Sequence, residues 1–246
     1  MLKGIQKAAS GMIPQLKKQE ISANNIANAT TPGFKKDSTF IKELDSATKA
    51  AMPKRSDWEQ PMIDQIYTDY SQGTFNKTGN PLDVAIDGEG FFILETIDGT
   101  DRQYSRNGSF SIDTEGFLVN SDGMRILGDG GPIAAGTGSS IMIDESGQVI
   151  IDGNVVGSLS VVDFADKSAL RKTGATGFIA DETLEPIPSD QFTIRQGYLE
   201  QSNINVIKEM VGMIITMRNF ETASKLIQTQ DDSLQTLFNE VGKTRI

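Results

Sequence analysis

Both ends of this chain carry apolar residues at the alternating three- and four-residue spacing of helices that pack against other helices. The N-terminal stripe consists of Leu2, Ile5, Ala9, Met12, Leu16, Gln19, Ala23 and Ile26. The C-terminal stripe consists of Val206, Met210, Met213, Met217, Phe220, Ser224, Ile227, Asp231, Leu234, Phe238 and Val241. Each buried Leu or Ile contributes about 1.5–3 kcal/mol, so neither helix would be stable alone in water. The two helices therefore need each other, or further copies of the chain.

Local signals set the limits of these helices. Pro14 lacks an amide hydrogen and clashes with the preceding turn, so it predicts a kink in the first helix or a later start. Thr31-Pro32-Gly33 predicts its end, because Pro cannot continue a helix and Gly accepts a left-handed exit. A second apolar file of Ile207, Val211 and Ile214 widens the C-terminal stripe at its start.

Between the helices the apolar spacing changes to the alternation of β-strands. Residues 82–86 alternate, and 104–112 predicts a hairpin in which Asn-Gly favours a type I′ turn. Residues 112–119 and 143–150 share a strand, Asp-x-x-Gly turn, strand pattern. Residues 80–195 are therefore predicted to form a mainly antiparallel β domain.

The fold class that follows is α+β, with N- and C-terminal helices paired as a coiled coil and an inserted, mainly antiparallel β domain. Residues 35–80 are polar and without a sustained period, which predicts an extended, partly disordered arm. The predicted domains are an N-terminal coiled-coil helix at 1–34, a linker arm at 35–80, the β domain at 81–196 and a C-terminal coiled-coil helix at 197–246.

The composition removes most catalytic chemistry. There is no Cys and no His, so thiol nucleophiles, zinc–thiolate sites and the commonest general base are excluded. Asp87 and Glu89 could form a carboxylate pair, but no feature of the sequence places them across a cleft. The acidic turns at 120–123 and 129–131 lack the full ligand set of a calcium loop. We expect no catalytic residue, no metal site and no cofactor.

Charge is distributed unevenly along the chain. The net charge is −10, with +5 over residues 1–36, −14 over 37–197 and −1 over 198–246. An acidic middle argues against nucleic acid as a partner. The N-terminus has no apolar run long enough for a signal peptide, and no window resembles a membrane span. If the protein leaves the cytosol, we expect a route without a cleaved signal.

Four motifs, in order along the chain, resemble the bacterial flagellar rod and hook family. The stretch 22–35 is similar to its N-terminal signature, in which Asn24, Asn25 and Asn28 are followed by Pro32, Gly33 and Phe34. Residues 83–92 and 104–110 resemble its β-domain motifs, and 197–206 resembles the start of its C-terminal helix.

The resemblance implies a structural subunit of the flagellar basal-body rod. Its terminal helices would pair in an inner layer around an export channel, with other rod and hook subunits as homo- and hetero-oligomeric partners. Such subunits are exported through the flagellar type III apparatus, which fits the missing signal peptide. The modest length favours a proximal over a distal rod subunit. No nucleic acid or small-molecule substrate is implied.

The predicted assembly surface lies on the two stripes. Its residues are Leu2, Ile5, Met12, Leu16, Ile26, Val206, Met210, Met213, Met217, Phe220, Ile227, Leu234 and Phe238. Two other classes of function remain as alternatives. A wall-active enzyme would need Asp87 and Glu89 in a cleft, and an exported adaptor or chaperone would leave the β domain unexplained.

Because assembly would bury faces that a lone monomer exposes, we predict that the terminal helices are poorly ordered before assembly. In a dilute monomer, limited proteolysis should remove both ends first, and circular dichroism should show less helix than two full terminal helices require. Strong helical signal together with protease-resistant ends would contradict this.

Overall fold

The computed structural model describes residues 2–42, 62–136, 140–181, 184–189 and 191–243. Side-chain surroundings are described within these ranges from residue 11 to 39 and from 66 to 240. The chain divides into two compact units. The helical unit comprises Met1–Ala27, Asp37–Thr68 and Asn205–Ile246, and the β unit comprises Asn28–Lys36 and Asp69–Ile204.

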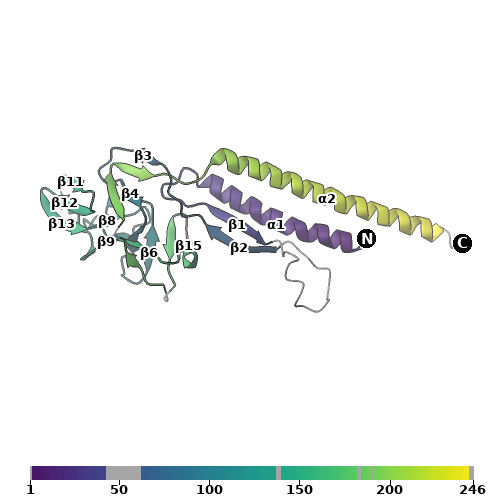
Figure 1. Cartoon of the computed structure of the whole chain (residues 1–246), viewed down its shortest axis with the longest axis horizontal. Helices are drawn as coiled ribbons and strands as arrows, with labels where there is room; N and C mark the ends of the chain where they lie inside the picture. Colours follow the sequence, from purple (N-terminus) through teal and green to yellow (C-terminus); the bar gives the residue numbers. More distant parts are fainter. Residues whose placement is uncertain (1, 43–61, 137–139, 182–183, 190, 244–246) are drawn as a thin grey trace. The chain divides into compact units, whose positions relative to one another are not determined.

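The helical unit is built on two long helices that lie side by side. Helix α1 runs over Leu2–Ala27 and α2 over Val206–Lys243. Figure 1 shows them running antiparallel, with both chain ends at the same end of the helix pair. Asn205 caps α2, since its side-chain oxygen accepts the amide of Lys208 at 3.0 Å. The two predicted terminal helices and their packing against each other are confirmed; coiled-coil geometry stays a prediction.

Pro14 lies inside α1, which begins at Leu2, so the predicted later start is wrong. The Pro14 side chain is buried. Its ring removes one backbone hydrogen bond, and burial of apolar surface on this side of the helix offsets part of that cost.

The segment that we predicted as an extended arm, 35–80, contains strands that the sequence analysis missed. β1 (Asp37–Lys42) pairs antiparallel with β2 (Met62–Thr68) in the helical unit. β3 (Phe75–Lys77) pairs with β19 (Tyr198–Glu200) in the β unit. Residues 43–61 lie outside the described part. The compact units thus divide the chain at other positions than the predicted domain boundaries.

The β unit consists of short strands, and every strand pair in its described residues is antiparallel. Its largest sheet has the strand order β15-β16-β6-β5-β9-β8-β7, with β14 beside β5 and β10 beside β9. The remaining strands are β4 (Val84–Gly88), β5 (Phe91–Glu95), β6 (Arg102–Ser105), β7 (Ser111–Ile112), β8 (Leu118–Val119), β9 (Arg125–Gly128), β10 (Gly131–Pro132), β11 (Ile141–Ile143), β12 (Gln148–Ile151), β13 (Asn154–Ser158), β14 (Val161–Asp163), β15 (Arg171–Thr173), β16 (Gly177–Ile179), β17 (Ile187–Pro188) and β18 (Phe192–Gln196). The 3-10 helix η2 spans Lys167–Ala169.

Two apolar clusters form the core of the β unit. The larger gathers aliphatic side chains from many strands around Phe92 and Phe110, whose rings meet edge to face at 5.2 Å between centroids. The smaller is aromatic, and in it Phe91 and Phe178 are 5.6 Å apart. Such edge-to-face pairs stabilise by about 0.5–1.5 kcal/mol beyond area burial. Successive core residues on β4 and β5 are buried, so the alternation predicted for residues 82–86 does not separate a buried from an exposed face.

The predicted hairpin at 104–112 does not form. β6 pairs with β5 and β16, whereas β7 pairs with β8. The Asn-Gly pair has a different structural role, because the Gly108 carbonyl accepts a hydrogen bond from the Val84 amide at 2.9 Å. A Cβ atom on Gly108 would lie 1.6 Å from the Val84 carbonyl oxygen. Close approach of two backbones, rather than a type I′ turn, therefore requires glycine here.

The two predicted repeats do form hairpins. β7 pairs with β8 and β11 pairs with β12 across the Asp-x-x-Gly turns. In each turn the aspartate, Asp113 or Asp144, accepts backbone amides two and four residues later. Asn120 does the same in the acidic turn at 120–123, where its oxygen accepts the amides of Asp122 and Met124. These oxygens stabilise turns.

Substitution of Gly108 by Ala should destabilise the β unit by about 1–3 kcal/mol or more, because the new methyl group overlaps a backbone carbonyl. The matched control is Gly130→Ala, where a Cβ would meet nothing within 4 Å. Urea unfolding of both variants measures the difference. Equal unfolding midpoints would contradict the close approach.

Candidate assembly site

The face of α2 that packs within the helical unit follows a seven-residue repeat. Six of the predicted stripe residues are partly buried: Val206, Met213, Phe220, Ile227 and Leu234, which recur every seven residues, and Ser224. The intervening contacts fall one residue earlier than predicted, and Thr216 is buried where Met217 was expected. The Thr216 hydroxyl donates to the Gly212 carbonyl at 2.9 Å, so its burial leaves no unsatisfied polar group.

Four predicted stripe residues of α2 are instead exposed: the acidic Asp231 and three apolar residues. Met210 and Met217 are about half exposed, and Phe238 is 76% exposed. The two apolar files of α2 together cover more of the helix surface than one neighbouring helix can bury. The structure thus places these three side chains on a surface that α1 does not cover.

On α1 the buried face also differs from the predicted stripe. Met12 and Ile26 are partly buried, whereas Leu16 is exposed. Buried positions are Pro14, Ile21 and Asn25. The side chains of Leu2 and Ile5 lie outside those described. This face could not be predicted from apolar spacing, because two of the three buried residues among the described side chains of α1 (residues 11–27) are a proline and an asparagine.

Asn25 has a structural role that apolar spacing could not predict, because its side chain is polar although it is buried. It is 1% exposed, and its side-chain amide pairs with the backbone of Asp37 in both directions. Its Nδ2 donates to the Asp37 carbonyl at 2.9 Å, and its Oδ1 accepts the Asp37 amide at 3.0 Å. The neighbouring family-motif residue Asn24 is exposed. Asn25 therefore fastens the last turn of α1 to the first residue of β1.

The rest of the N-terminal motif belongs to the β unit. The Asn28 side chain accepts the Thr31 hydroxyl at 3.4 Å, and Pro32 is partly buried. Gly33 has φ of +70°, and a Cβ there would lie 2.3 Å from the Asn107 amide nitrogen. Phe34 is 1% exposed and lies under the Lys172 ammonium at 3.9 Å. The motif thus forms a turn in which only glycine fits at position 33.

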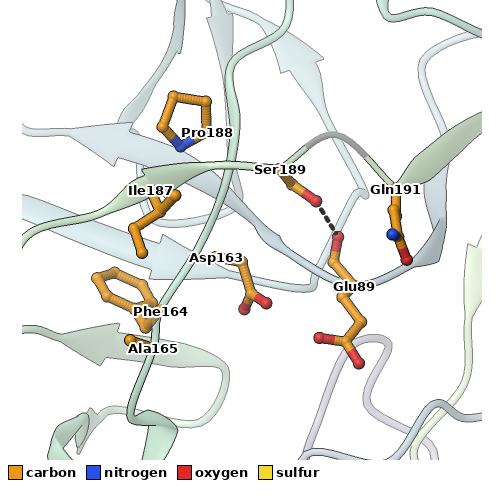
Figure 2. Close-up of a pocket in the computed structure, with 8 residues that line it drawn as sticks. All are labelled: Glu89, Asp163, Phe164, Ala165, Ile187, Pro188, Ser189 and Gln191. Atoms are coloured by element: carbon orange, nitrogen blue, oxygen red, sulfur yellow. Dashed lines mark hydrogen bonds between the residues drawn. The ribbon is translucent and has the colours of Figure 1, made fainter.

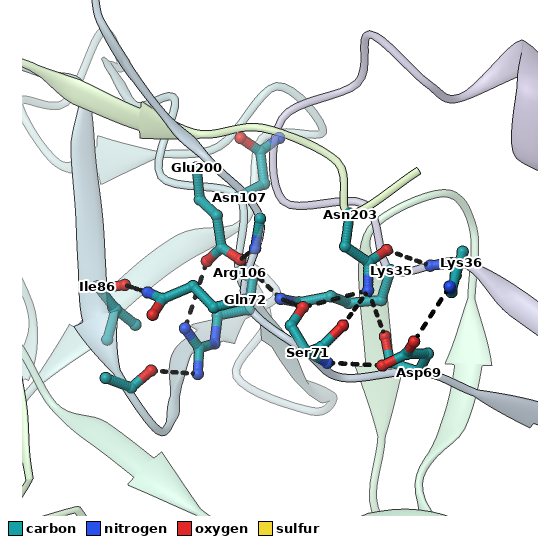
Figure 3. A network of polar contacts seen from close by, with 12 residues as sticks. Lys35, Lys36, Asp69, Ser71, Gln72, Ile86, Arg106, Asn107, Glu200 and Asn203 are labelled. Atoms are coloured by element: carbon teal, nitrogen blue, oxygen red, sulfur yellow. Dashed lines mark hydrogen bonds and ion pairs between the residues drawn. The ribbon is translucent and has the colours of Figure 1, made fainter. Parts of the chain in front are cut away.

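Directly after this motif lies a buried ionic cluster, shown in Figure 3. The Glu200 carboxylate accepts from Lys35 Nζ at 2.6 Å, from the Gly73 amide at 2.9 Å and from Arg106 Nη1 at 3.3 Å. The side chains of Lys35, Arg106 and Glu200 are 1%, 5% and 0% exposed. One carboxylate therefore holds two cations from distant parts of the sequence.

Backbone contacts complete the cluster. Lys35 Nζ also donates to the Ser71 carbonyl at 2.8 Å, and Arg106 Nη2 donates to the Gly88 carbonyl at 2.8 Å. The Gly33 amide donates to the Glu200 carbonyl at 2.8 Å. The segments around residues 33–36, 71–73, 106 and 200 are thereby joined at one point of the β unit.

Burial lowers the pKa of Lys35 and of Arg106, while the nearby Glu200 carboxylate raises both and so limits the shift. Removing one partner of a buried pair leaves the other charge without compensation, which costs more than the pair itself contributes. No part of this cluster was predicted from the sequence. Its three charged residues are 94 and 165 residues apart, and no local pattern connects them.

Asn203 adds a second polar link beside the cluster. Its Oδ1 accepts the Lys36 amide at 2.9 Å, and its Nδ2 donates to the Asp69 carbonyl at 2.8 Å. Lys36 Nζ and Asp69 Oδ2 form an ion pair at 3.3 Å. Burial alone would raise the pKa of Asp69, but hydrogen bonds from Ser71 and the charge of Lys36 lower it. The chain thus enters and leaves the β unit along hydrogen-bonded segments.

The carboxylate pair considered for an enzyme does not converge. Asp87 forms an ion pair with Arg195, whose Nε lies 2.9 Å from Oδ2. Glu89 lines an open pocket of about 270 Å³ together with Asp163, shown in Figure 2, and Asp87 is not among the lining residues. Lys167 forms ion pairs with both pocket carboxylates, at 2.9 and 3.1 Å. One ammonium group therefore pairs with both pocket carboxylates, and the described lining residues do not place two unpaired acidic groups opposite each other.

Within the described ranges, no group of three or more acidic side chains is arranged to hold a metal ion. Among the same residues, no helix is both long and apolar enough to cross a membrane.

Paired terminal helices and a β unit inserted between them define a structural α+β protein. The protein families that the chain matches belong to the same class. Three family models match the chain: "Flagella basal body rod protein" over residues 5–35, "Flagellar hook protein FlgE/F/G D1 domain" over 85–151 and "Flagellar basal body rod FlgEFG protein C-terminal" over 195–240.

Curated relatives match almost the full length. The flagellar basal-body rod protein FlgG of Bacillus subtilis is 34% identical, over 97% of this chain and 99% of its own. FlgG of Borreliella burgdorferi is 32% identical, over 95% and 97%. The rod protein FlgF of Caulobacter vibrioides is 32% identical, over 91% of both chains. The chain belongs to the flagellar basal-body rod protein family, and it is therefore a structural protein of the flagellar basal body.

Glu200→Gln should destabilise the protein by about 3–5 kcal/mol, because it leaves two buried cations without a counter-charge. The matched control is Asp181→Asn, which breaks the exposed ion pair with Arg171 and should cost at most about 1 kcal/mol. Chemical denaturation of both variants measures the difference. A cost for Glu200→Gln no greater than that of the control would show that the cluster is not a structural anchor.

Proposed function

We propose that this chain polymerises through its terminal helices into the axial rod of the flagellum. The observation that carries the proposal is the surplus of apolar surface on α2, where Met210, Met217 and Phe238 remain at least half exposed beside a packed helix partner. A monomeric protein rarely leaves such a face uncovered. In a rod, neighbouring subunits would bury it, and further heptad contacts would then give the helices coiled-coil packing.

The rest of the predicted interface fits this role. Leu16 is exposed on α1, whereas Val206, Phe220 and Ile227 are partly buried against the other helix. Leu16 would contact neighbouring subunits, and the partly buried residues of α2 would hold the two helices of one copy together. The partners would be other copies of this chain and other rod and hook subunits. We propose export through the flagellar type III apparatus, on the basis of the family to which the chain belongs.

The rod would act as a drive shaft and as the wall of an export conduit. Both roles require a stiff polymer rather than a catalytic centre. The β unit would supply stiffness through its two cores and its ionic cluster, while the helices would supply the contacts between subunits. The length of the chain favours a proximal position, and a distal position is the alternative.

In cells that lack this gene, electron cryotomography should show basal bodies with an incomplete rod and no hook. A structure that stalls directly above the inner-membrane ring indicates a proximal subunit, and a longer truncated rod indicates a distal one. Re-expression of the full chain is the control and should restore the rod. Intact flagella in the deletion strain would contradict the proposal.

A further inference from the structure

Helix α2 is longer than the helix it packs against. α1 has 26 residues and α2 has 38, so α2 is about 18 Å longer at 1.5 Å per residue. Figure 1 shows α2 continuing past the N-terminal end of α1. We call residues 231–243 the overhang. All of residues 235–240 are exposed, including Leu237 at 44% and Phe238 at 76%.

A second uncovered surface lies at the opposite end of α2. Six apolar side chains within 11 residues are half exposed or more, and we call them the start stripe: Ile207, Met210, Val211, Ile214, Ile215 and Met217. The stripe is about 16 Å long, close to the length of the overhang. It lies to one side of the file of partly buried residues that packs within the helical unit.

The positions of these surfaces make them complementary between copies. The overhang is at the end of α2 and the start stripe is at its beginning. If one copy is displaced along the helix axis by about the length of α1, its start stripe lies level with the overhang of the copy before it. Two apolar surfaces of similar length then cover each other, and each buried large side chain contributes about 1.5–3 kcal/mol.

The charges on the two surfaces also match. Asp231 and Asp232 are exposed on the overhang, and Lys208 and Arg218 are exposed around the start stripe. A displacement of about 26 residues places Asp231 level with the first turn of α2 in the next copy, within reach of Lys208. Opposite charges at such a contact favour the correct register and disfavour others.

We propose that the overhang of one copy packs on the start stripe of the next copy, in a head-to-tail contact between parallel α2 helices. This inference rests on the proposed function and identifies the surfaces that carry it. A head-to-tail contact uses two different surfaces and does not close on itself, so it extends into an open filament.

Disulfide cross-linking tests this contact directly, since the natural chain contains no cysteine. The variant Val211→Cys/Phe238→Cys places one thiol on each surface. Within one copy the two positions are 27 residues apart on one helix, about 40 Å, so they cannot form an intramolecular bond. Oxidation of isolated basal bodies that contain this variant should give a ladder of covalent multimers, which a reductant collapses to monomers.

The controls are the two single variants and the pair Val211→Cys/Thr222→Cys, in which Thr222 is exposed midway along α2. None of these should give a ladder. Monomer alone from basal bodies that contain the Val211→Cys/Phe238→Cys chain would overturn the contact. If the wild-type chain itself is absent from isolated basal bodies, the proposed function fails instead.

Charge reversal provides a second measurement that does not depend on thiols. Asp231→Lys should lower incorporation into basal bodies about threefold to tenfold, whereas Glu221→Lys, the same change between the two surfaces, should not. Co-expression of Lys208→Glu with Asp231→Lys should restore incorporation. These two residues are about 35 Å apart within one copy, so rescue requires contact between copies. Equal incorporation of Asp231→Lys and Glu221→Lys would overturn the proposal.

Discussion

The β unit depends on one buried carboxylate. Glu200 compensates Lys35 and Arg106 and also accepts a backbone amide, so it joins segments from the start, middle and end of this unit. Two cations around one anion form a costly arrangement in a protein interior. Backbone carbonyls and the face of Phe91, 5.4 Å from the Arg106 guanidinium, offset part of that cost. Correct assembly of this point requires all four segments to be in place.

The helical unit follows a different principle. Its helices pack through a narrow file of partly buried side chains, and its polar anchor is the amide of Asn25 rather than an ion pair. Much of its apolar surface remains at the outside, on Ile207 and Phe238 above all. A unit that is incompletely buried in one copy is suited to complete its core with neighbours. The chain thus combines a well-packed β unit with a helical unit whose apolar surface is only partly buried within one copy.

The features that depend on local spacing could be predicted from the sequence. Helices at both chain ends, the antiparallel hairpins at Asp113 and Asp144, and the glycine turn at Gly33 all follow from residues near one another in the chain. The family could likewise be identified from the sequence, because each of its four motifs consists of residues that are close together in the chain. The prediction of a hairpin at Asn107-Gly108 was wrong, because this dipeptide occurs both in tight turns and where two backbones lie close together. The ionic cluster was missed because its partners meet only after the β unit has folded.

The paired segments at residues 33–36 and 200–203 have a further consequence. Because Gly33 donates to Glu200 and Lys36 donates to Asn203, the chain enters and leaves the β unit at neighbouring points. A module with adjacent ends can be lengthened, shortened or exchanged while the distance that its flanking segments must span stays constant. The same pair of terminal helices can therefore carry inserted domains of different size, which offers a simple physical route to related proteins that keep the helical unit while the inserted domain changes.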